Sequence, residues 1–488
     1  MADLSSDLQK SITDLQTQHT NLVQAIRDYR GGSLATATND LLSAAEDVEK
    51  KIAAQESGFI GMLAANAKYP LPNIVLDFKN EVYLVGDGGG LKTVDPVDYL
   101  NLEEYSGNGS VIGSSGKVEP GPGAGLRYTH DPVTGEKQGV WVEGFSNNYI
   151  LAQDFSSPFW SKEGSSVTQD NTVTPPISGL PVFKLVPTTD GVFRSLRIVS
   201  VPDGVVKDAS YSIFMKAGNY GLMKMQVNLD SGSDDAGINV NLDNGSYNTY
   251  GSVRYAGAID HGNGWWRVWM SVDGTPTSQC KMAWFQSTAT QSDYVYVCGA
   301  QIENRYSPTS FIYLDAEGST GTRNSDVFQI LPSGEINSRQ GTFVITLYPR
   351  AIHGNLWYID TLHVDSSNSY DPFAIRTGGT AMANLYVPGL GNVPTPDAAN
   401  GTYNLEHQNK VTVALGVDTN TGTVTAWVDG VMQETISDIP SYYQPMDMAK
   451  IGFGRWLSGG QFSSAIWEKI VYYPYMITLE QGQELTAP

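Results

Sequence analysis

Hydrophobic and polar positions alternate along much of the chain after residue 150, which is the pattern of β-strands with one buried face. The segment that begins at Gly264 shows this alternation most clearly. One face of its first strand is apolar and is expected to point into a core, whereas the other face is mixed. The apolar face contains Trp266, Val268, Met270 and Val272, and the mixed face contains Trp265, Arg267, Trp269, Ser271 and Asp273.

Two further strands, Cys280–Phe285 and Tyr294–Cys298, are predicted to pair as a hairpin that turns near residue 289. This pairing sets Trp284 opposite Tyr294 and Cys280 opposite Cys298, and such cross-strand pairs fix the register of a hairpin. Two cysteines are too few for a disulfide framework. We expect two buried thiols, with a bond across the hairpin as the alternative.

The first 60 residues follow a different pattern, in which apolar residues recur at alternating spacings of four and three. This is the heptad seam of an α-helical coiled coil, interrupted by Gly31 and Gly32. The glycine pair leaves open a continuous kinked helix or a helical hairpin. Because so polar a helix needs partners, we predict a parallel homo-oligomer, with a trimer favoured. The seam residues expected to hold it together are Leu8, Ile12, Leu15, Leu22, Ile26, Leu41, Val48 and Ile52.

Turn signals and shifts in composition divide the chain into five parts. Residues 1–60 form the coiled coil and residues 61–150 a connector of short strands and Gly-rich loops. Residues 151–315 form a first sandwich, residues 316–340 a linker, and residues 341–488 a second sandwich with a short helix over 478–486. The predicted fold class is mainly β, with an N-terminal coiled-coil helix followed by two β-sandwich (jelly-roll) domains.

The chain of 488 residues carries a formal net charge of −21, which argues against a nucleic-acid partner because phosphate backbones are repelled. No apolar run is long enough to span a membrane, so membrane insertion is not expected. The first residues lack the basic and apolar regions of a signal peptide, and we therefore expect folding in the cytoplasm of a cell.

Candidate metal chemistry is sparse. The six histidines have no cysteine at zinc spacing, and no G-x-S-x-G elbow is present. An acidic loop holds Asp230, Asp234 and Asp235 and offers oxygen ligands for Ca²⁺, although it lacks the register of an EF-hand. We expect a solvated turn there and no cofactor, with structural calcium as the alternative.

Sugar binding needs an aromatic ring that stacks on the C–H groups of a pyranose, with polar neighbours for the hydroxyls. Trp265, Arg267 and Trp269 lie on one strand face and meet this need if that face is open. Trp357 and Trp456 are the candidates in the second sandwich. The alternative is that these tryptophans are buried against a second sheet or a neighbouring subunit.

Several short motifs resemble the structural and fibre proteins of tailed bacteriophages. These motifs are Asp131–Glu136, Gly139–Glu143 with Asn147-Asn148, Asp154–Lys162, and the linker Thr322–Asp326. Gly262–Val268, Gly299–Asn304 and Ser307–Ile312 resemble the end of a carbohydrate-binding-like jelly roll. Residues 341–475, with the turn Trp427–Gly430, resemble concanavalin-like (laminin-G-type) sandwiches. The resemblance implies a virion protein that meets glycans on the host surface.

We therefore expect a virion protein of a tailed phage, assembled in the host cytoplasm and anchored to other virion proteins through its N-terminus. A tail fibre or spike that binds bacterial surface polysaccharide without catalysis is favoured, and a head fibre or capsid decoration protein is the alternative. A capsule depolymerase is a further alternative hypothesis. Concanavalin-like glycanases carry closely spaced carboxylates on one strand, and residues 341–475 show no such strand.

Overall fold

The computed structural model divides the chain into two compact units, Met1–Leu71 and Pro72–Pro488. The described residues are 68–86, 91–102, 109–123, 125–189, 194–199, 205, 209–229, 235–326, 328–331, 334–337, 339–350, 410–437, 450–453 and 464–488, with the backbone of the strands between 356 and 394. The predicted coiled-coil seam from Leu8 to Ile52 lies outside them, as do Asp230, Asp234 and Trp456. The described part is mainly β, as predicted.

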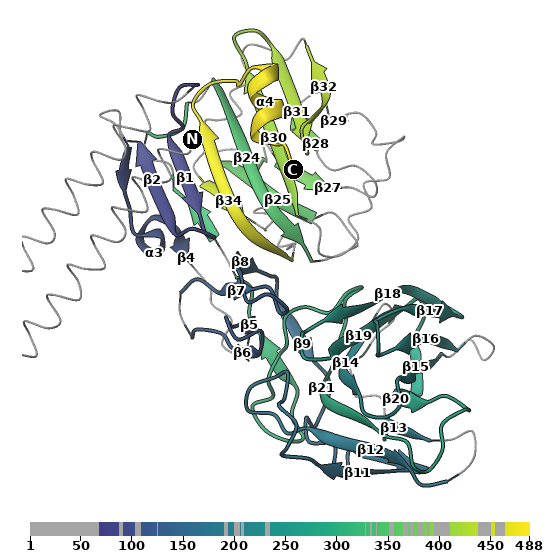
Figure 1. Cartoon of the computed structure of the whole chain (residues 1–488). Helices are drawn as coiled ribbons and strands as arrows, with labels where there is room; N and C mark the ends of the chain where they lie inside the picture. The colour runs from purple at the N-terminus through teal and green to yellow at the C-terminus, as the bar shows by residue number, and fades with distance from the viewer. Residues whose placement is uncertain are drawn as a thin grey trace, which may run out of the picture. The chain divides into compact units, whose positions relative to one another are not determined.

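The first sandwich consists of two antiparallel six-stranded sheets (Figure 1). The β15 sheet has the order β10 (Trp160–Glu163), β13 (Ser195–Ile198), β20 (Pro276–Phe285), β15 (Leu222–Leu229), β16 (Ala236–Asn241) and β17 (Tyr247–Tyr250). The β19 sheet has the order β11 (Ser165–Gln169), β12 (Phe183–Pro187), β21 (Val295–Glu303), β14 (Ser210–Ala217), β19 (Trp265–Val272) and β18 (Val253–Asp260).

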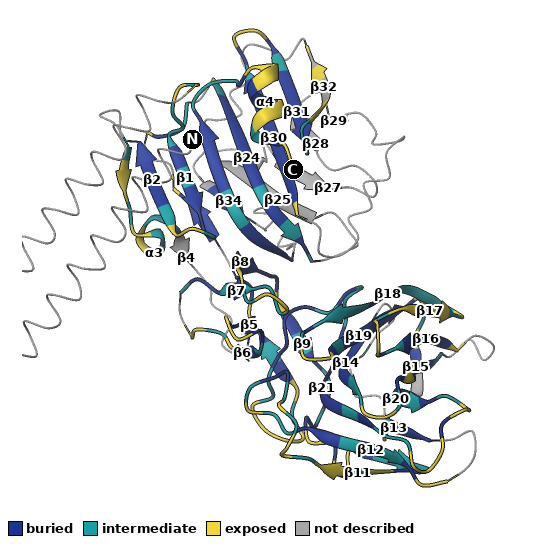
Figure 2. Cartoon of the chain, viewed as in Figure 1, coloured by how far each residue is buried: buried dark blue, intermediate teal, exposed yellow. Residues whose placement is uncertain are grey.

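The core of this sandwich lies between the two sheets, because each sheet turns its apolar positions toward the other. Val268, Met270 and Val272 of β19 pack in one buried cluster with Met223 and Met225 of β15. The apolar face predicted for β19 is therefore confirmed, and Trp266 packs half-buried at its margin. Figure 2 shows that most of β14, β19 and β21 is buried.

The predicted hairpin of the two cysteine strands is wrong. β20 pairs with β13 and β15, whereas β21 pairs with β12 and β14 in the opposite sheet. The connection between the two strands crosses from one layer to the other, so Cys280 and Cys298 do not face each other. Cys280 lies in the core, and Cys298 lies in a second cluster outside the β19 sheet. Both are free buried thiols, and burial raises the pKa of Cys298 to about 12.

The second sandwich is built on a ten-stranded antiparallel sheet. Its main path is β3 (Leu91–Thr93), β2 (Val82–Gly86), β1 (Ile74–Asp77), β34 (Ala465–Tyr473), β24 (Gln340–Pro349), β30 (Val411–Asp418), β31 (Thr423–Val428) and β32 (Val431–Ile436). β8 (Lys137–Val142) also pairs with β34 and joins β7 (Tyr128–His130) to the sheet. Residues 61–150, which we expected to be a connector, thus supply five strands of this sheet.

The remaining elements are short. The facing sheet has the order β26 (Ser369–Tyr370), β25 (Leu356–Val364), β33 (Lys450–Phe453), β23 (Phe328–Ile330) and β4 (Asn101–Leu102), with β27 (Ala374–Thr377) beside β25. Three two-stranded pairs are β5 (Ser110–Ile112) with β6 (Val118–Pro120), β9 (Ser146–Asn148) with β22 (Gly321–Arg323), and β28 (Asn384–Val387) with β29 (Gly391–Pro394). Within the described residues the helices are α3 (Pro96–Tyr99) and α4 (Leu479–Leu485), the latter as predicted.

A buried polar cluster connects segments of the two sandwiches. We call it the Glu143 network, and it consists of Arg127, Glu143, Arg323 and Asp326. Arg127 Nη2 donates to Glu143 Oε2 at 3.0 Å and also bonds to Asp326. Glu143 Oε1 accepts from Ser310 N at 2.8 Å and from the Ser464 hydroxyl at 3.1 Å. One carboxylate therefore ties β8 to the segment after β21 and to the residue before β34.

The close approach of β8 to β34 requires a glycine at position 139. Gly139 has φ +144°, and a Cβ there would lie 2.0 Å from the carbonyl oxygen of Trp467 in β34. We expect Gly139→Ala to lower the free energy of unfolding by about 3 kcal/mol, through overpacking and backbone strain. Urea denaturation measures this, with Gly123→Ala as the control because nothing lies within 4 Å of its Cβ position. Equal midpoints for the two variants would contradict the prediction.

Candidate functional site

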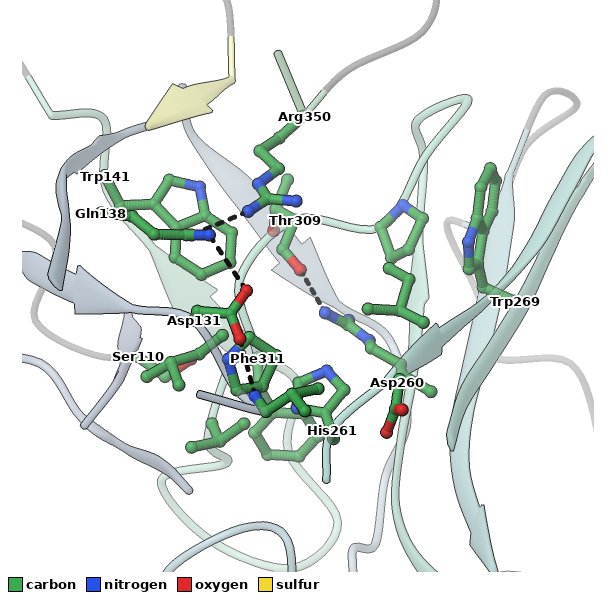
Figure 3. Close-up of a pocket in the computed structure, with 17 residues that line it drawn as sticks. Ser110, Asp131, Gln138, Trp141, Asp260, His261, Trp269, Thr309, Phe311 and Arg350 are labelled. Carbon is green, nitrogen blue, oxygen red and sulfur yellow. Dashed lines mark hydrogen bonds between the residues drawn. The ribbon is translucent and has the colours of Figure 1, made fainter. Parts of the chain in front are cut away.

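A cavity of about 170 Å³ lies where the β7–β8 turn, the end of β18, and β19 approach one another (Figure 3). Segments far apart in the sequence line it. The polar lining residues are Ser110, Asp131, Gln138, Asp260, His261, Arg267, Thr309 and Arg350, and the aromatic ones are Trp141, Trp269 and Phe311. Aromatic faces beside hydrogen-bonding groups are the usual composition of a small-molecule site.

One wall is a chain of polar contacts that starts in the β7–β8 turn. Asp131 Oδ1 accepts from Val133 N at 2.9 Å and Thr134 N at 2.8 Å, which shapes the turn. Asp131 Oδ2 accepts from Gln138 Nε2 at 3.3 Å, and Gln138 Oε1 accepts from Arg350 Nη2 at 3.1 Å (Figure 3). Through these contacts Arg350, which follows β24, lies beside the β7–β8 turn.

The opposite wall is Arg267, which β19 holds almost fully buried. Its Nη1 donates to the carbonyl oxygen of Thr309 at 2.7 Å, and its Nη2 donates to the Ser212 hydroxyl at 3.1 Å. The guanidinium also lies 5.5 Å from the ring centroid of Phe214. Burial lowers the pKa of Arg267 to about 10, so the side chain remains cationic at neutral pH.

His261 follows β18 and is also buried, with 7% of its surface exposed. Its ring packs edge-on against Phe214, with centroids 4.8 Å apart. Burial, together with the nearby charges of Arg267 and Arg350, lowers the pKa of His261 to about 3. The imidazole is therefore neutral at pH 7 and offers one donor and one acceptor nitrogen.

Three nitrogen atoms at this cavity lack a hydrogen-bond partner in the part of the chain that the structure describes. They are Trp141 Nε1, His261 Nδ1 and Arg350 Nε. A buried polar group without a partner costs about 1–3 kcal/mol, and each such group in a folded protein calls for an explanation. Groups from a bound ligand or ordered water would satisfy all three.

The burial of neutral His261 predicts a specific pH dependence of stability. The unfolded chain binds a proton at this residue near pH 6.5 and the folded protein only near pH 3, so stability falls as the pH drops below 6.5. Between pH 6.5 and 4.5 we expect His261 to account for a loss of about 2–3 kcal/mol. Urea denaturation between pH 6.5 and 4.5 should show a smaller loss of unfolding free energy for His261→Gln than for the unaltered protein. If the unfolding free energy of the variant fell with pH as steeply as that of the unaltered protein, the assignment would be contradicted.

The site residues predicted on β19 are only partly in the expected geometry. Trp265 and Trp269 have 2% and 0% of their surface exposed, so an open aromatic platform does not exist on this face. The second cluster covers Trp265, whose Nε1 donates to the Thr174 carbonyl at 3.0 Å. Arg267 and Trp269 instead line the cavity. For Trp357, which lies in β25, the described structure is limited to the backbone.

Sequence reasoning did not select Asp131, Gln138, Trp141 or Arg350 as site residues. Asp131 and Trp141 do stand in the motifs that resemble phage proteins. Arg350 follows directly on the alternating strand β24, and an arginine at a strand end gives no indication of the segment it will meet. The pairing of β8 with β34, which is not visible in local patterns, is what brings these residues together.

Among the described residues, no group of three His, Cys, Asp or Glu side chains is arranged to hold a metal ion. Of the predicted calcium ligands, Asp235 is described; it is exposed and accepts from Gln226 Nε2 at 2.7 Å. In the same described part of the chain, no helix has the length and hydrophobicity that crossing a membrane requires.

Comparisons with known proteins give structural neighbours alone. No family model matches the chain, and no curated protein matches it. A carbohydrate-binding module (CBM40) of a Ruminococcus gnavus sialidase, solved with α2,3-sialyllactose, is 14% identical and has a TM-score of 0.24; the match covers 30% of this chain and 83% of that one.

Two further neighbours are similarly distant. Domain 4 of an extracellular arabinanase from Geobacillus stearothermophilus, solved with arabinotriose, is 14% identical, with a TM-score of 0.27 and coverage of 38% and 83%. The mouse laminin α1 domains LG4–5 are 8% identical, with a TM-score of 0.22 and coverage of 68% and 88%. The phage context stays a prediction, because none of these three is a phage protein.

Proposed function

We propose that the protein binds glycans without turnover and that the cavity receives a single sugar unit. The observation that carries this proposal is the set of three unpartnered nitrogens, on Trp141, His261 and Arg350, beside aromatic rings. Sugar hydroxyls both donate and accept hydrogen bonds, and the C–H faces of a pyranose pack on aromatic rings.

The charge of the lining favours a sugar over a simple anion. Two arginines, Arg267 and Arg350, are balanced by two carboxylates, Asp131 and Asp260. The volume of about 170 Å³ is smaller than the roughly 300–1,000 Å³ of pockets for drug-sized ligands, which fits one sugar rather than a long oligosaccharide.

The proposed absence of turnover rests on how the two carboxylates are held. A glycosidase needs one carboxyl group as acid and a second as base or nucleophile, both facing the scissile bond. Asp131 accepts from the backbone of its own turn, and Asp260 Oδ1 accepts from Gly262 N at 2.7 Å. These bonds give the carboxylates a role in shaping turns.

The test is a glycan array probed with the full-length protein, followed by competition with free monosaccharides. Competition by one sugar at millimolar concentration supports the proposal, since weak single sites gain strength through multivalency. Absence of binding to any glycan or to bacterial surface polysaccharide would contradict it. Release of reducing ends from a bound polysaccharide would replace it with the depolymerase reading.

On the basis of the sequence motifs, we propose that the protein is a tail fibre or spike of a tailed phage. A head fibre or capsid decoration protein is the alternative. Immunogold labelling of intact virions with an antibody to residues 150–488 separates these readings. Gold at the tail supports a fibre, and gold over the capsid supports the alternative. Purified particles without gold would contradict both.

A further inference from the structure

The outer face of the β15 sheet carries two rows of side chains that run straight across all six strands. The inward positions, such as Met223, Met225 and Cys280, belong to the core, so the residues between them point away from it. Among the latter, Ser195, Gln226, Gly237 and Lys281 are buried, and the others are half-buried or exposed. The strand register aligns one outward row as Glu163, Ser195, Trp284, Lys224, Asn239 and Asn248.

The second row follows from the same registers. It contains Ser161, Arg197, Lys281, Gln226, Gly237 and Tyr250. Five strand spacings of about 4.8 Å make each row about 24 Å long, which is the scale of a polymer segment rather than a single sugar.

The charge of these rows is opposite to that of the chain. The whole protein has 51 acidic and 30 basic residues, whereas the two rows hold three cations, Arg197, Lys224 and Lys281, against the single anion Glu163. Asp235 lies close by and accepts from Gln226 Nε2. Arg197 is directly opposite Lys281 in the register, and like charges in such a pair repel each other.

Aromatic rings and unpartnered polar groups accompany these cations. Trp284 is half-buried, with Lys281 Nζ 4.1 Å and Lys224 Nζ 5.4 Å from its ring. Beside them, Arg197 Nε and Ser195 Oγ are buried and have no hydrogen-bond partner within the described residues. At the far end, the Tyr250 ring lies over Gly237, where a Cβ would come within 2.1 Å of the ring.

We propose that this face is a second binding site, which takes a segment of a polysaccharide bearing carboxylate groups. The carboxylates would pair with Arg197 and Lys224, which are partly exposed, and the sugar rings would pack along Trp284 and Tyr250. Nucleic acid is another polyanion, and the test therefore includes single-stranded DNA as a competing ligand. This site is on the opposite sheet from β19 and does not depend on the cavity.

The test uses the immobilised full-length protein and two soluble probes, polygalacturonate and neutral dextran. We expect binding of polygalacturonate, little binding of dextran, and a loss of about tenfold or more in affinity between about 20 and 500 mM NaCl. The double variant Arg197→Gln/Lys224→Gln should bind about tenfold more weakly, and Lys224→Arg alone should retain affinity. Lys216→Gln removes a cation from the other sheet and is the matched control.

Several results would overturn the proposal: equal binding of dextran, salt-independent binding, an unchanged affinity of the double variant, or tighter binding of single-stranded DNA than of polygalacturonate. Circular dichroism of each variant shows whether it is folded, and the salt dependence of the unaltered protein tests the site without any substitution. The double variant Arg197→Gln/Lys224→Gln should bind the sugar identified on the glycan array as tightly as the unaltered protein, which distinguishes failure of this site from failure of the cavity.

Discussion

Replacing Glu143 with glutamine is expected to lower the free energy of unfolding by about 3–5 kcal/mol, the usual cost of breaking a buried ion pair from one side. The carboxylate is fully buried between Arg127 and Arg323, and it also accepts from Ser310 and Ser464. Glutamine keeps the volume but leaves the two cations with Asp326 as their remaining anion in the Glu143 network.

Urea denaturation at pH 7 measures this loss, and the matched control is Glu81→Gln. Glu81 pairs with Lys137 at 2.6 Å on the surface, and its loss should cost less than about 1 kcal/mol. If Glu143→Gln cost no more than the control, the network would not hold the fold together. A common loss in both variants would point to the net charge of the protein instead.

Acid should act on the same network in the unaltered protein. Burial raises the pKa of Glu143, but the charges of Arg323 and Arg127 outweigh this effect and lower the pKa to about 2. The unfolded chain binds the proton near pH 4.5, so the contribution of Glu143 is complete above that pH and is lost as the pH falls toward 2. This window lies below the range in which His261 is tested.

The second large effect is expected at the cavity. Trp141→Phe removes the unpartnered indole nitrogen and keeps an aromatic ring, and Arg350→Lys removes the unpartnered Nε and keeps the charge. We expect each variant to weaken binding of the sugar identified on the array by about tenfold, because a lost hydrogen bond is worth about 1–1.5 kcal/mol. Together they should weaken it by about a hundredfold.

Isothermal titration calorimetry with the free sugar measures these affinities. Trp266→Phe is the matched control, because Trp266 lies on the opposite face of the strand that carries Arg267 and packs against the core. If the control lost affinity as strongly as Trp141→Phe, the loss would reflect disturbed folding. If neither cavity variant lost affinity, the sugar would bind elsewhere.

Local alternation of hydrophobic residues was enough to predict individual strands. The strand predicted after Gly264 coincides with β19, and its predicted apolar face packs in the core. Alternation shows which residues of a strand are buried, but it carries no information about the strand that lies next to it. That is why β20 and β21, which are consecutive in the sequence, were assigned to one hairpin although they lie in opposite sheets.

The candidate site shows the same limit. Arg267 and Trp269 were selected because they share a strand face, and both line the cavity. Gln138 and Arg350, which line the same cavity, come from segments more than 80 residues away on either side, so no local spacing connects them to this strand. The motifs that resemble phage proteins did contain Glu143, Arg323 and Asp326, yet only the structure shows that these residues form one buried network.

The pairing of β1 with β34 has a mechanical consequence. A pull on the chain through Ile74 would act on a strand whose register partner is Tyr472, close to the other end of the described chain. β9 and β22, which precede and follow the first sandwich, are zipped together as an antiparallel pair. Tension applied between Ile74 and Tyr472 would therefore act on the hydrogen bonds of the ten-stranded sheet. The first sandwich lies between β9 and β22 in the sequence, outside the path of this force, and would bear none of it.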